Sequence, residues 1–302
     1  MDVGVIGVGV MGRNHARVYS ELKQVDSLWI TDLNTKAATE VAKANDGQVS
    51  SGVDELLEKV DAVSICVPTP FHHDVAAKVF AAGVHALIEK PICQTSAQAE
   101  ALLKIIPKDL TVGVGHIERF NPIIDEIRRM INKPLYIETK RHNPASSRIT
   151  GTSVVEDLMI HDIDVIFNLF PRKDYSLHSA GNADVCGALI AISGTTVYMS
   201  ASRKSSKKIR MIYIEQEDCT IEGDYMTQEI AIYRKPGQYT IVHDRYVQEN
   251  IIEKVLVNKQ EPLKRELSTF LECAAAKKSF PITPEQALQN LRVSEQITHG
   301  FS

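Results

Sequence analysis

Two groups of residues in this 302-residue chain have the types and spacing needed for acid–base chemistry. The first is Glu89-Lys90-Pro91, which directly follows the short, mostly apolar run 84–88. Such a run predicts a buried strand of a parallel sheet, and ligands bind at the carboxyl edge of such sheets. Lys90 is therefore either a solvated lysine at a strand end or a working side chain, and the tripeptide alone favours neither.

The second group comprises Asp157, His161 and Asp164, in a segment whose apolar residues recur at helical spacing. Four residues place Asp157 and His161 on one face of a helix, with Asp164 one turn further along. A carboxylate beside an imidazole orients the ring and favours its charged form, which suits a histidine that takes a proton from a hydroxyl. The alternative is a hydrogen-bonded core histidine, and the segment alone favours that alternative.

A glycine-rich turn at the start of the chain predicts a dinucleotide site. It follows the predicted strand 3–8 and precedes a helix that continues through 13–22. In this fingerprint the first glycine allows a tight turn, the second lets pyrophosphate approach bare backbone, and the third lets helix and strand pack closely. The helix amino end adds N–H groups and a positive dipole for phosphate. The expected cofactor contacts in this turn are Gly7, Gly9, Val10, Met11 and Gly12.

Asp32 directly follows the second predicted strand, 27–31, and lies 20 residues beyond Gly12. This is near the spacing of a carboxylate that binds the ribose hydroxyls of adenosine. The alternative is a turn or helix-cap aspartate. A carboxylate there would repel a 2′-phosphate, which favours NAD over NADP, although Lys36 is close in sequence and leaves NADP open.

Polar residues also follow the predicted strand 62–67, at the same carboxyl edge. Thr69 is placed to donate to the cofactor, whereas His72 and His73 are either site residues or solvated residues of a helix's first turn. The further cofactor contacts expected at this edge are Pro68, Thr69, His72, Glu89 and Lys90.

Strands and helices alternate up to residue 120, which predicts an α/β, doubly wound parallel-sheet (Rossmann) domain over 1–120. After a helix that begins near residue 121, strand candidates follow one another with short turns, which predicts an α+β domain with a largely antiparallel open sheet over 121–302. The two closing helices, 261–277 and one started by Thr283 and Pro284, belong to this domain or pack back on the first. An exposed sheet face suits a homodimer or homotetramer.

Composition excludes several classes of protein. With 34 basic and 38 acidic side chains, a net charge of −4 and no basic block, neither nucleic acid nor membrane is an expected partner. The five cysteines show no Cys-x-x-Cys spacing, so no disulfide framework or metal site is expected. The sequence shows no secretory leader and no apolar run of roughly 18 residues. We therefore expect a cytoplasmic protein.

Four motifs occur in a specific order: the glycine-rich turn, Pro68-Thr69 with His72, Glu89-Lys90-Pro91, and Asp157 with His161 and Asp164. In this order and spacing they resemble the glucose-fructose oxidoreductase, inositol dehydrogenase and MocA (Gfo/Idh/MocA) family along essentially the whole chain. The resemblance implies that Lys90 and His161 are catalytic and that Asp157 completes a triad. One departure is Thr152-Ser153, where glycines usually precede the helix.

Within the family, segment 113–122 and the polar loop 141–148 resemble the branch that oxidises the 3-hydroxyl of UDP-N-acetylglucosamine. Arg141 and Arg148 would suit a diphosphate, because a planar guanidinium binds phosphate oxygens in a fork. The substrate contacts expected from the resemblance are Arg119, Arg148 and Asp164.

The sequence thus predicts an NAD-dependent dehydrogenase that takes a hydride from a sugar hydroxyl carbon, with the substrate between the two domains. His161 would remove the hydroxyl proton, and Lys90 would stabilise charge on the same oxygen. Three alternatives stay open: a dehydrogenase of free sugars or inositols, an enzyme that retains its NAD through transient redox, and a non-catalytic NAD-binding regulator of the same fold.

Overall fold

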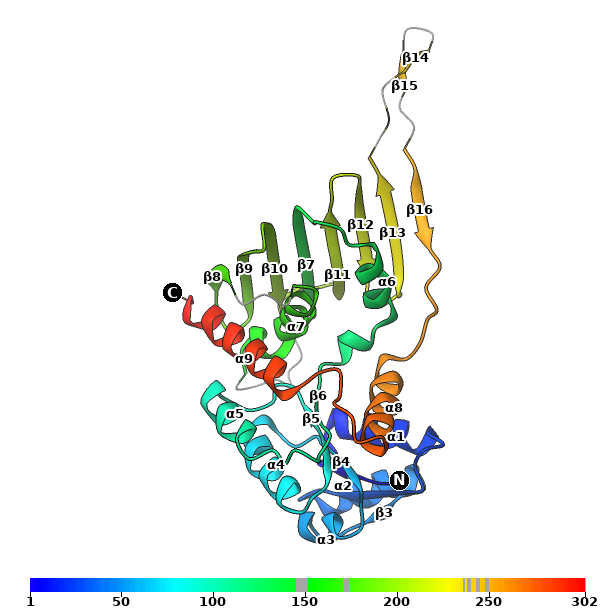
Figure 1. The fold of residues 1–302 in the computed structure, drawn as a ribbon, viewed down its shortest axis with the longest axis vertical. Coiled ribbons are helices and arrows are strands. Elements are labelled where there is room, and N and C mark those ends of the chain that lie inside the picture. Colours follow the sequence, from blue (N-terminus) through cyan, green and yellow to red (C-terminus); the bar gives the residue numbers. More distant parts are fainter. Residues whose placement is uncertain are drawn as a thin grey trace. The chain divides into compact units, whose positions relative to one another are not determined.

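The chain folds into two compact units (Figure 1). The computed structural model describes residues 1–144, 152–170, 174–235, 237, 240–242, 245–247 and 250–301. Unit 1 comprises Met1–Phe120 and Glu261–Arg292, and unit 2 comprises Asn121–Gln260 and Val293–Ser302. None of the helices formed by the described residues is both long and apolar enough to cross a membrane.

Unit 1 contains a six-stranded sheet in the order β3-β2-β1-β4-β5-β6. Its strands are β1 (Asp2–Ile6), β2 (Ser27–Thr31), β3 (Gln48–Val49), β4 (Ala62–Ile65), β5 (His85–Glu89) and β6 (Val112–Gly115). Every pairing is parallel, which confirms the doubly wound α/β fold. The strand order reverses between β1 and β4, and the carboxyl ends of strands at such a switch point form the ligand crevice in open α/β sheets.

Helices connect these strands and carry the apolar residues of the unit 1 core. They are α1 (Val10–Glu21), α2 (Thr35–Ala44), α3 (Val53–Leu57), α4 (His72–Ala81), α5 (Ser96–Leu103) and α8 (Pro262–Ala275), with short 3-10 turns η1 (Thr69–Phe71) and η2 (Ile117–Phe120). The segment after α8 joins the same core: the Phe280 ring lies so close to Gly113 of β6 that a Cβ there would be 2.3 Å from it. Unit 1 also includes α9 (Pro284–His299) up to Arg292.

Unit 2 contains an eight-stranded sheet in the order β16-β13-β12-β11-β7-β10-β9-β8. Its strands are β7 (Tyr136–His142), β8 (Tyr175–Gly181), β9 (Val185–Ile192), β10 (Thr195–Ser202), β11 (Ile209–Glu215), β12 (Cys219–Asp224), β13 (Glu229–Arg234) and β16 (Ile252–Val255). The sheet is largely antiparallel, as predicted, but β7 and β10 pair in parallel. A parallel pair needs a long crossover, and the chain between these two strands supplies it.

One face of this sheet is covered by α6 (Pro122–Met130), the π turn η3 (Val155–Met159) and α7 (Ile160–Leu169) (Figure 1). Buried residues alternate with half-exposed ones along β7, so the opposite face carries side chains such as Tyr136 and Tyr213, whose ring centroids are 6.5 Å apart. A separate two-stranded pair is formed by β14 (Thr240–Val242) and β15 (Arg245–Val247).

Candidate active site

The glycine-rich turn between β1 and α1 has the geometry of a phosphate cradle. Gly7 has φ +91°, a conformation that suits glycine, and a Cβ at Gly12 would lie 1.9 Å from the carbonyl oxygen of Gly7. A Cβ at Gly9, by contrast, would meet no described atom within 4 Å. Gly7 and Gly12 thus permit the close turn, whereas Gly9 leaves exposed backbone beside the amino end of α1, where N–H groups attract phosphate.

Asp32, directly after β2, holds this turn. Its Oδ2 atom accepts a hydrogen bond from the Val8 N–H at 2.7 Å, and its Oδ1 atom accepts one from the Asn34 N–H at 2.7 Å. The carboxylate therefore has the turn role that the sequence offered as an alternative. Each oxygen has a second lone pair, so these bonds are compatible with a further contact to ribose.

The loop after β4 places Thr69 and His72 differently. Thr69 begins η1 and is half-buried, whereas His72 begins α4 and is 1% exposed. The His72 ring nitrogens lie 2.8 Å from the carbonyl oxygens of Val67 and Pro91. His73, the neighbour, contacts the exposed Asp74 at 2.9 Å.

Lys90 follows the last residue of β5 and is half-buried. Its backbone N–H donates to Glu89 Oε2 at 3.2 Å, and Glu89 Oε1 lies 2.9 Å from His15 Nε2 of α1. Burial acts to raise the pKa of Glu89, but the His15 hydrogen bond and the neighbouring positive charges outweigh it and leave that pKa below its ordinary value. Glu89 thus has protein partners on both oxygens, and its predicted contact with the cofactor stays a prediction. The Lys90–Pro91 peptide is cis.

His15, Glu89 and Glu266 form a buried group whose potential ligand atoms lie within 4.8 Å of one another. Among the described residues, this is the group with a spacing compatible with a metal ion. His15 Nε2 and Glu89 Oε1 already lie at hydrogen-bond distance. The sequence prediction that the protein needs no metal stays a prediction.

In unit 2, Asp157 and His161 lie on consecutive elements. Asp157 belongs to the π turn η3, and His161 is the second residue of α7 and is half-buried. The sequence predicts one continuous α-helix here, whereas Asp157 lies in a π turn, which has i→i+5 hydrogen bonds, and His161 lies in the α-helix that follows. Such turns occur often at functional sites.

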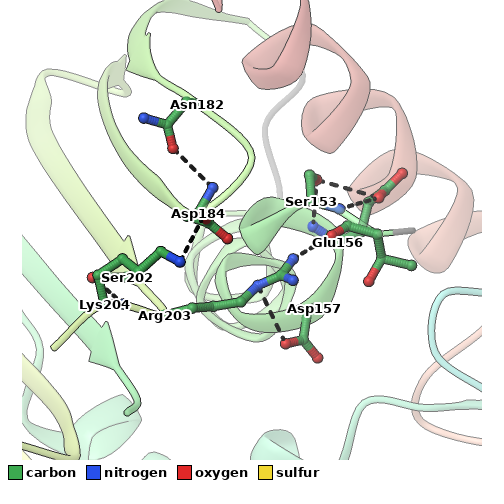
Figure 2. Close-up of polar contacts among 9 residues, drawn as sticks. Ser153, Glu156, Asp157, Asn182, Asp184, Ser202, Arg203 and Lys204 are labelled. Carbon is green, nitrogen blue, oxygen red and sulfur yellow. Dashed lines mark hydrogen bonds and ion pairs between the residues drawn. The ribbon is translucent and has the colours of Figure 1, made fainter. Parts of the chain in front are cut away.

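Arg203, just after β10 (Thr195–Ser202), approaches Asp157 (Figure 2). Its Nε lies 3.9 Å from Asp157 Oδ2, and its Nη2 donates to the carbonyl oxygen of Thr152. Arg203 is 7% exposed. Sequence reasoning missed this arginine because only the fold brings the end of β10 to the π turn.

The residues that depart from the family pattern, Thr152-Ser153, directly precede this helical segment. The Ser153 hydroxyl accepts from the Glu156 N–H at 3.3 Å, and Glu156 Oε2 accepts from the Ser153 N–H at 3.0 Å (Figure 2). This reciprocal pair is a capping box. Serine at this position thus has a local structural reason.

The expected substrate residues have diverse surroundings. Arg141 is 1% exposed and forms a two-point ion pair with Asp162, with N···O distances of 3.0 and 2.8 Å. The expectation that Arg141 binds a diphosphate is therefore wrong, because its guanidinium is buried and paired inside unit 2. Arg119 donates to Gln286 Oε1 at 2.9 Å within unit 1. Asp164 is 1% exposed, and Arg148 lies outside the described residues.

Comparisons with known proteins place the chain among oxidoreductases. Residues 1–116 match the family model described as "Oxidoreductase family, NAD-binding Rossmann fold", the Gfo/Idh/MocA model. The chain is 33% identical over 285 residues to UDP-N-acetylglucosamine 3-dehydrogenase of Acidithiobacillus ferrooxidans, covering 91% of this chain and 89% of that protein. It is 31% identical to inositol 2-dehydrogenase 2 of Saccharopolyspora erythraea over 55% of this chain and 52% of that one.

Solved structures extend the likeness to both units. A structure of the Acidithiobacillus ferrooxidans UDP-N-acetylglucosamine 3-dehydrogenase has a TM-score of 0.89 and 30% identity, and the match covers 100% of this chain and 97% of that chain. A levoglucosan dehydrogenase in complex with NADH and levoglucosan, at 18% identity and a TM-score of 0.82, shares the fold over 99% of this chain and 96% of its own. The chain therefore belongs to the Gfo/Idh/MocA family of oxidoreductases.

Proposed function

We propose that this protein is an NAD-dependent dehydrogenase that oxidises the C3 hydroxyl of a UDP-N-acetylhexosamine. The observation that carries the proposal is the 33% identity, over 91% of the chain, with a UDP-N-acetylglucosamine 3-dehydrogenase. The inositol 2-dehydrogenase relative named above matches only 55% of the chain, which makes inositol the second candidate substrate class.

The glycine-rich turn and Asp32 support a bound dinucleotide. Open backbone at Gly9 would receive the pyrophosphate, and the Asp32 carboxylate would favour the free ribose hydroxyls of NAD over the 2′-phosphate of NADP. Pro68, Thr69 and Lys90 would contact the nicotinamide half of the cofactor, which supplies the hydride acceptor when bound. His72 and Glu89 would contact the cofactor only in competition with the protein groups that they already bind, the Pro91 carbonyl oxygen and His15.

Two side chains would act on the substrate hydroxyl. His161 would accept its proton, and the Lys90 ammonium would hydrogen-bond the same oxygen and stabilise negative charge that develops there. Asp157 would orient the His161 ring, with Arg203 holding Asp157. Arg148 remains the proposed diphosphate contact. The Gln286 bond of Arg119 and the burial of Asp164 favour structural roles for these two.

The direct test incubates the purified protein with NAD or NADP and with separate panels of UDP-N-acetylhexosamines, free N-acetylhexosamines and inositols. Reduced nicotinamide is followed by absorbance, and the oxidised carbon is identified by mass spectrometry. Reduction of NAD with a UDP-N-acetylhexosamine alone supports the proposal. Turnover only with inositols would overturn it, and so would tightly retained cofactor with no net reduction on any substrate.

The proposed roles predict two inactive variants. Lys90→Met and His161→Asn are each expected to lower kcat by about 100-fold or more, because each removes a group that stabilises charge or moves a proton in the transition state. Circular dichroism and NAD binding control for folding. Wild-type turnover in both folded variants would contradict the proposed catalytic roles of Lys90 and His161.

The oligomeric state is also part of the proposal. The half-exposed outer face of the eight-stranded sheet, with Tyr136 and Tyr213, supports a homodimer or homotetramer, which analytical ultracentrifugation tests.

A further inference from the structure

His72 is a buried imidazole that the proposed chemistry does not use. It begins α4 and is 1% exposed. Its Nδ1 lies 2.8 Å from the Pro91 carbonyl oxygen, and its Nε2 lies 2.8 Å from the Val67 carbonyl oxygen. A carbonyl oxygen only accepts, so a ring nitrogen bonds to it only when it carries a proton.

Pro91 has one backbone group that His72 can bind. It has no N–H, so its carbonyl is its one backbone group able to hydrogen-bond. On the other side of Lys90, β5 is fixed by its pairing with β4 and β6 and by Glu89, whose carboxylate holds the Lys90 N–H. The His72 contact to Pro91 therefore fixes the second side of the lysine's backbone.

Near neutral pH the His72 ring has one N–H to donate, although two carbonyl oxygens lie within hydrogen-bond distance. Burial lowers the pKa of His72, against the hydrogen bonds of the two carbonyls, so the ring favours the neutral form with a single N–H. A neutral ring donates to Pro91 or to Val67, not to both.

We propose that His72 is a positioning residue for Lys90, which it holds by donating from Nδ1 to the carbonyl oxygen of Pro91. The proposal rests on the proposed catalytic role of Lys90. It gives this histidine a role toward the protein backbone, in place of a contact with the cofactor. A misplacement of a catalytic group by about 1 Å is enough to cost about 100-fold in rate.

Two amide variants separate the two contacts. In His72→Asn the side-chain NH2 takes the place of Nδ1, and in His72→Gln it takes the place of Nε2, so only the first keeps a donor toward Pro91. We expect His72→Asn to keep kcat within about threefold of wild type and His72→Gln to lose about tenfold or more, with similar Tm and similar NAD affinity. His72→Phe, which has no donor, is expected to behave as His72→Gln.

The results distinguish this inference from the proposed function. If Lys90→Met is inactive but His72→Asn and His72→Gln lose kcat equally, or in proportion to Tm, the positioning role is wrong and the catalytic lysine stands. If Lys90→Met is fully active, the proposed function itself fails.

A measurement on the wild-type protein does not depend on the folding of any variant. In protein labelled with 15N-histidine, nuclear magnetic resonance assigns the proton of each His72 ring nitrogen. We expect a slowly exchanging proton on Nδ1. A ring with its proton on Nε2 alone would overturn the proposal.

Discussion

Glu89 is a buried carboxylate one residue before the proposed catalytic lysine. It is 6% exposed, and its oxygens contact His15 Nε2 and the Lys90 N–H. The pKa of Glu89 lies below its ordinary value although burial alone would raise it. A carboxyl whose pKa is lower in the folded protein than in the unfolded chain stabilises the fold only while it is ionised.

This sign predicts how Glu89→Gln changes stability with pH. In wild type, the Glu89 contribution is complete above the unfolded-state pKa of about 4.3 and is lost as the pH falls through the lower folded-state pKa. At neutral pH we expect the variant to lose about 1–3 kcal/mol in free energy of unfolding, because a charge-assisted buried bond is removed. The difference between the proteins should shrink as the pH falls below about 4.3.

Urea unfolding at a series of pH values measures this difference. Asp54→Asn is the matched control, because Asp54 is an exposed carboxylate on α3 of the same unit and should change stability little. A deficit of Glu89→Gln that is constant across the whole pH range would contradict the prediction.

The sequence predicts catalytic roles for Lys90, Asp157 and His161 because their motifs are local and ordered, and these roles stay predictions. It did not identify His15 or Arg203. His15 lies three residues after Gly12 on α1 and contacts Glu89 at the end of β5, far along the chain. Arg203 follows β10 and meets Asp157 of η3, which lies far from it in the sequence. Such contacts join segments that are distant in the sequence, so the spacing of residues within one segment does not predict them.

At the scale of elements, the β1–α1 turn predicts opposite effects for two glycines. Gly12→Ala should destabilise the protein strongly, because its Cβ would lie 1.9 Å from a backbone oxygen that cannot move freely. Gly9→Ala meets no described atom within 4 Å and should leave the free energy of unfolding within about 1 kcal/mol of wild type. Its methyl group should nevertheless block the pyrophosphate and weaken NAD binding about tenfold or more.

Fluorescence titration with NAD and urea unfolding measure the two effects separately. Gly52→Ala is the matched control, since Gly52 also precedes a helix and a Cβ there meets no described atom within 4 Å. It should retain NAD affinity. Unchanged affinity in Gly9→Ala would contradict the assignment of this turn to phosphate.

The sequence predicts where a helix begins better than whether a turn is of the α or the π type. Thr283 and Gln286 form the capping bonds that the sequence indicates, with N···O distances of 3.3 and 3.4 Å at the start of α9. The π turn η3 was not predicted, because α and π turns use the same apolar residues and differ only in which carbonyl accepts each N–H. Strand β3, with two residues, is too short to show alternation.

At the scale of the molecule, the change from alternating strands and helices to consecutive strands predicted both sheets. The sequence did not determine where Glu261–Arg292 belongs, because an amphipathic helix shows which of its faces is buried but not against what. In the structure, Phe270 and Phe280 of this segment have ring centroids 6.1 Å apart and join the core of unit 1. Each unit has its own apolar core.

Because each unit has its own core, amide hydrogen exchange with and without NAD can show which unit holds the cofactor. At an NAD concentration about 100 times Kd, binding stabilises the protein by about 2.7 kcal/mol. Because the glycine-rich turn and Asp32 belong to unit 1, amide hydrogen exchange should slow in peptides that contain β1, α1 and the segment after β2. Peptides from β12 and β13 of unit 2 serve as internal references and should change little. If Gly9→Ala weakens NAD binding about tenfold, the same NAD concentration is about 10 times its Kd, so its protection should fall to about 1.4 kcal/mol. Protection of unit 2 strands without protection of the β1–α1 turn would mean that the dinucleotide binds elsewhere.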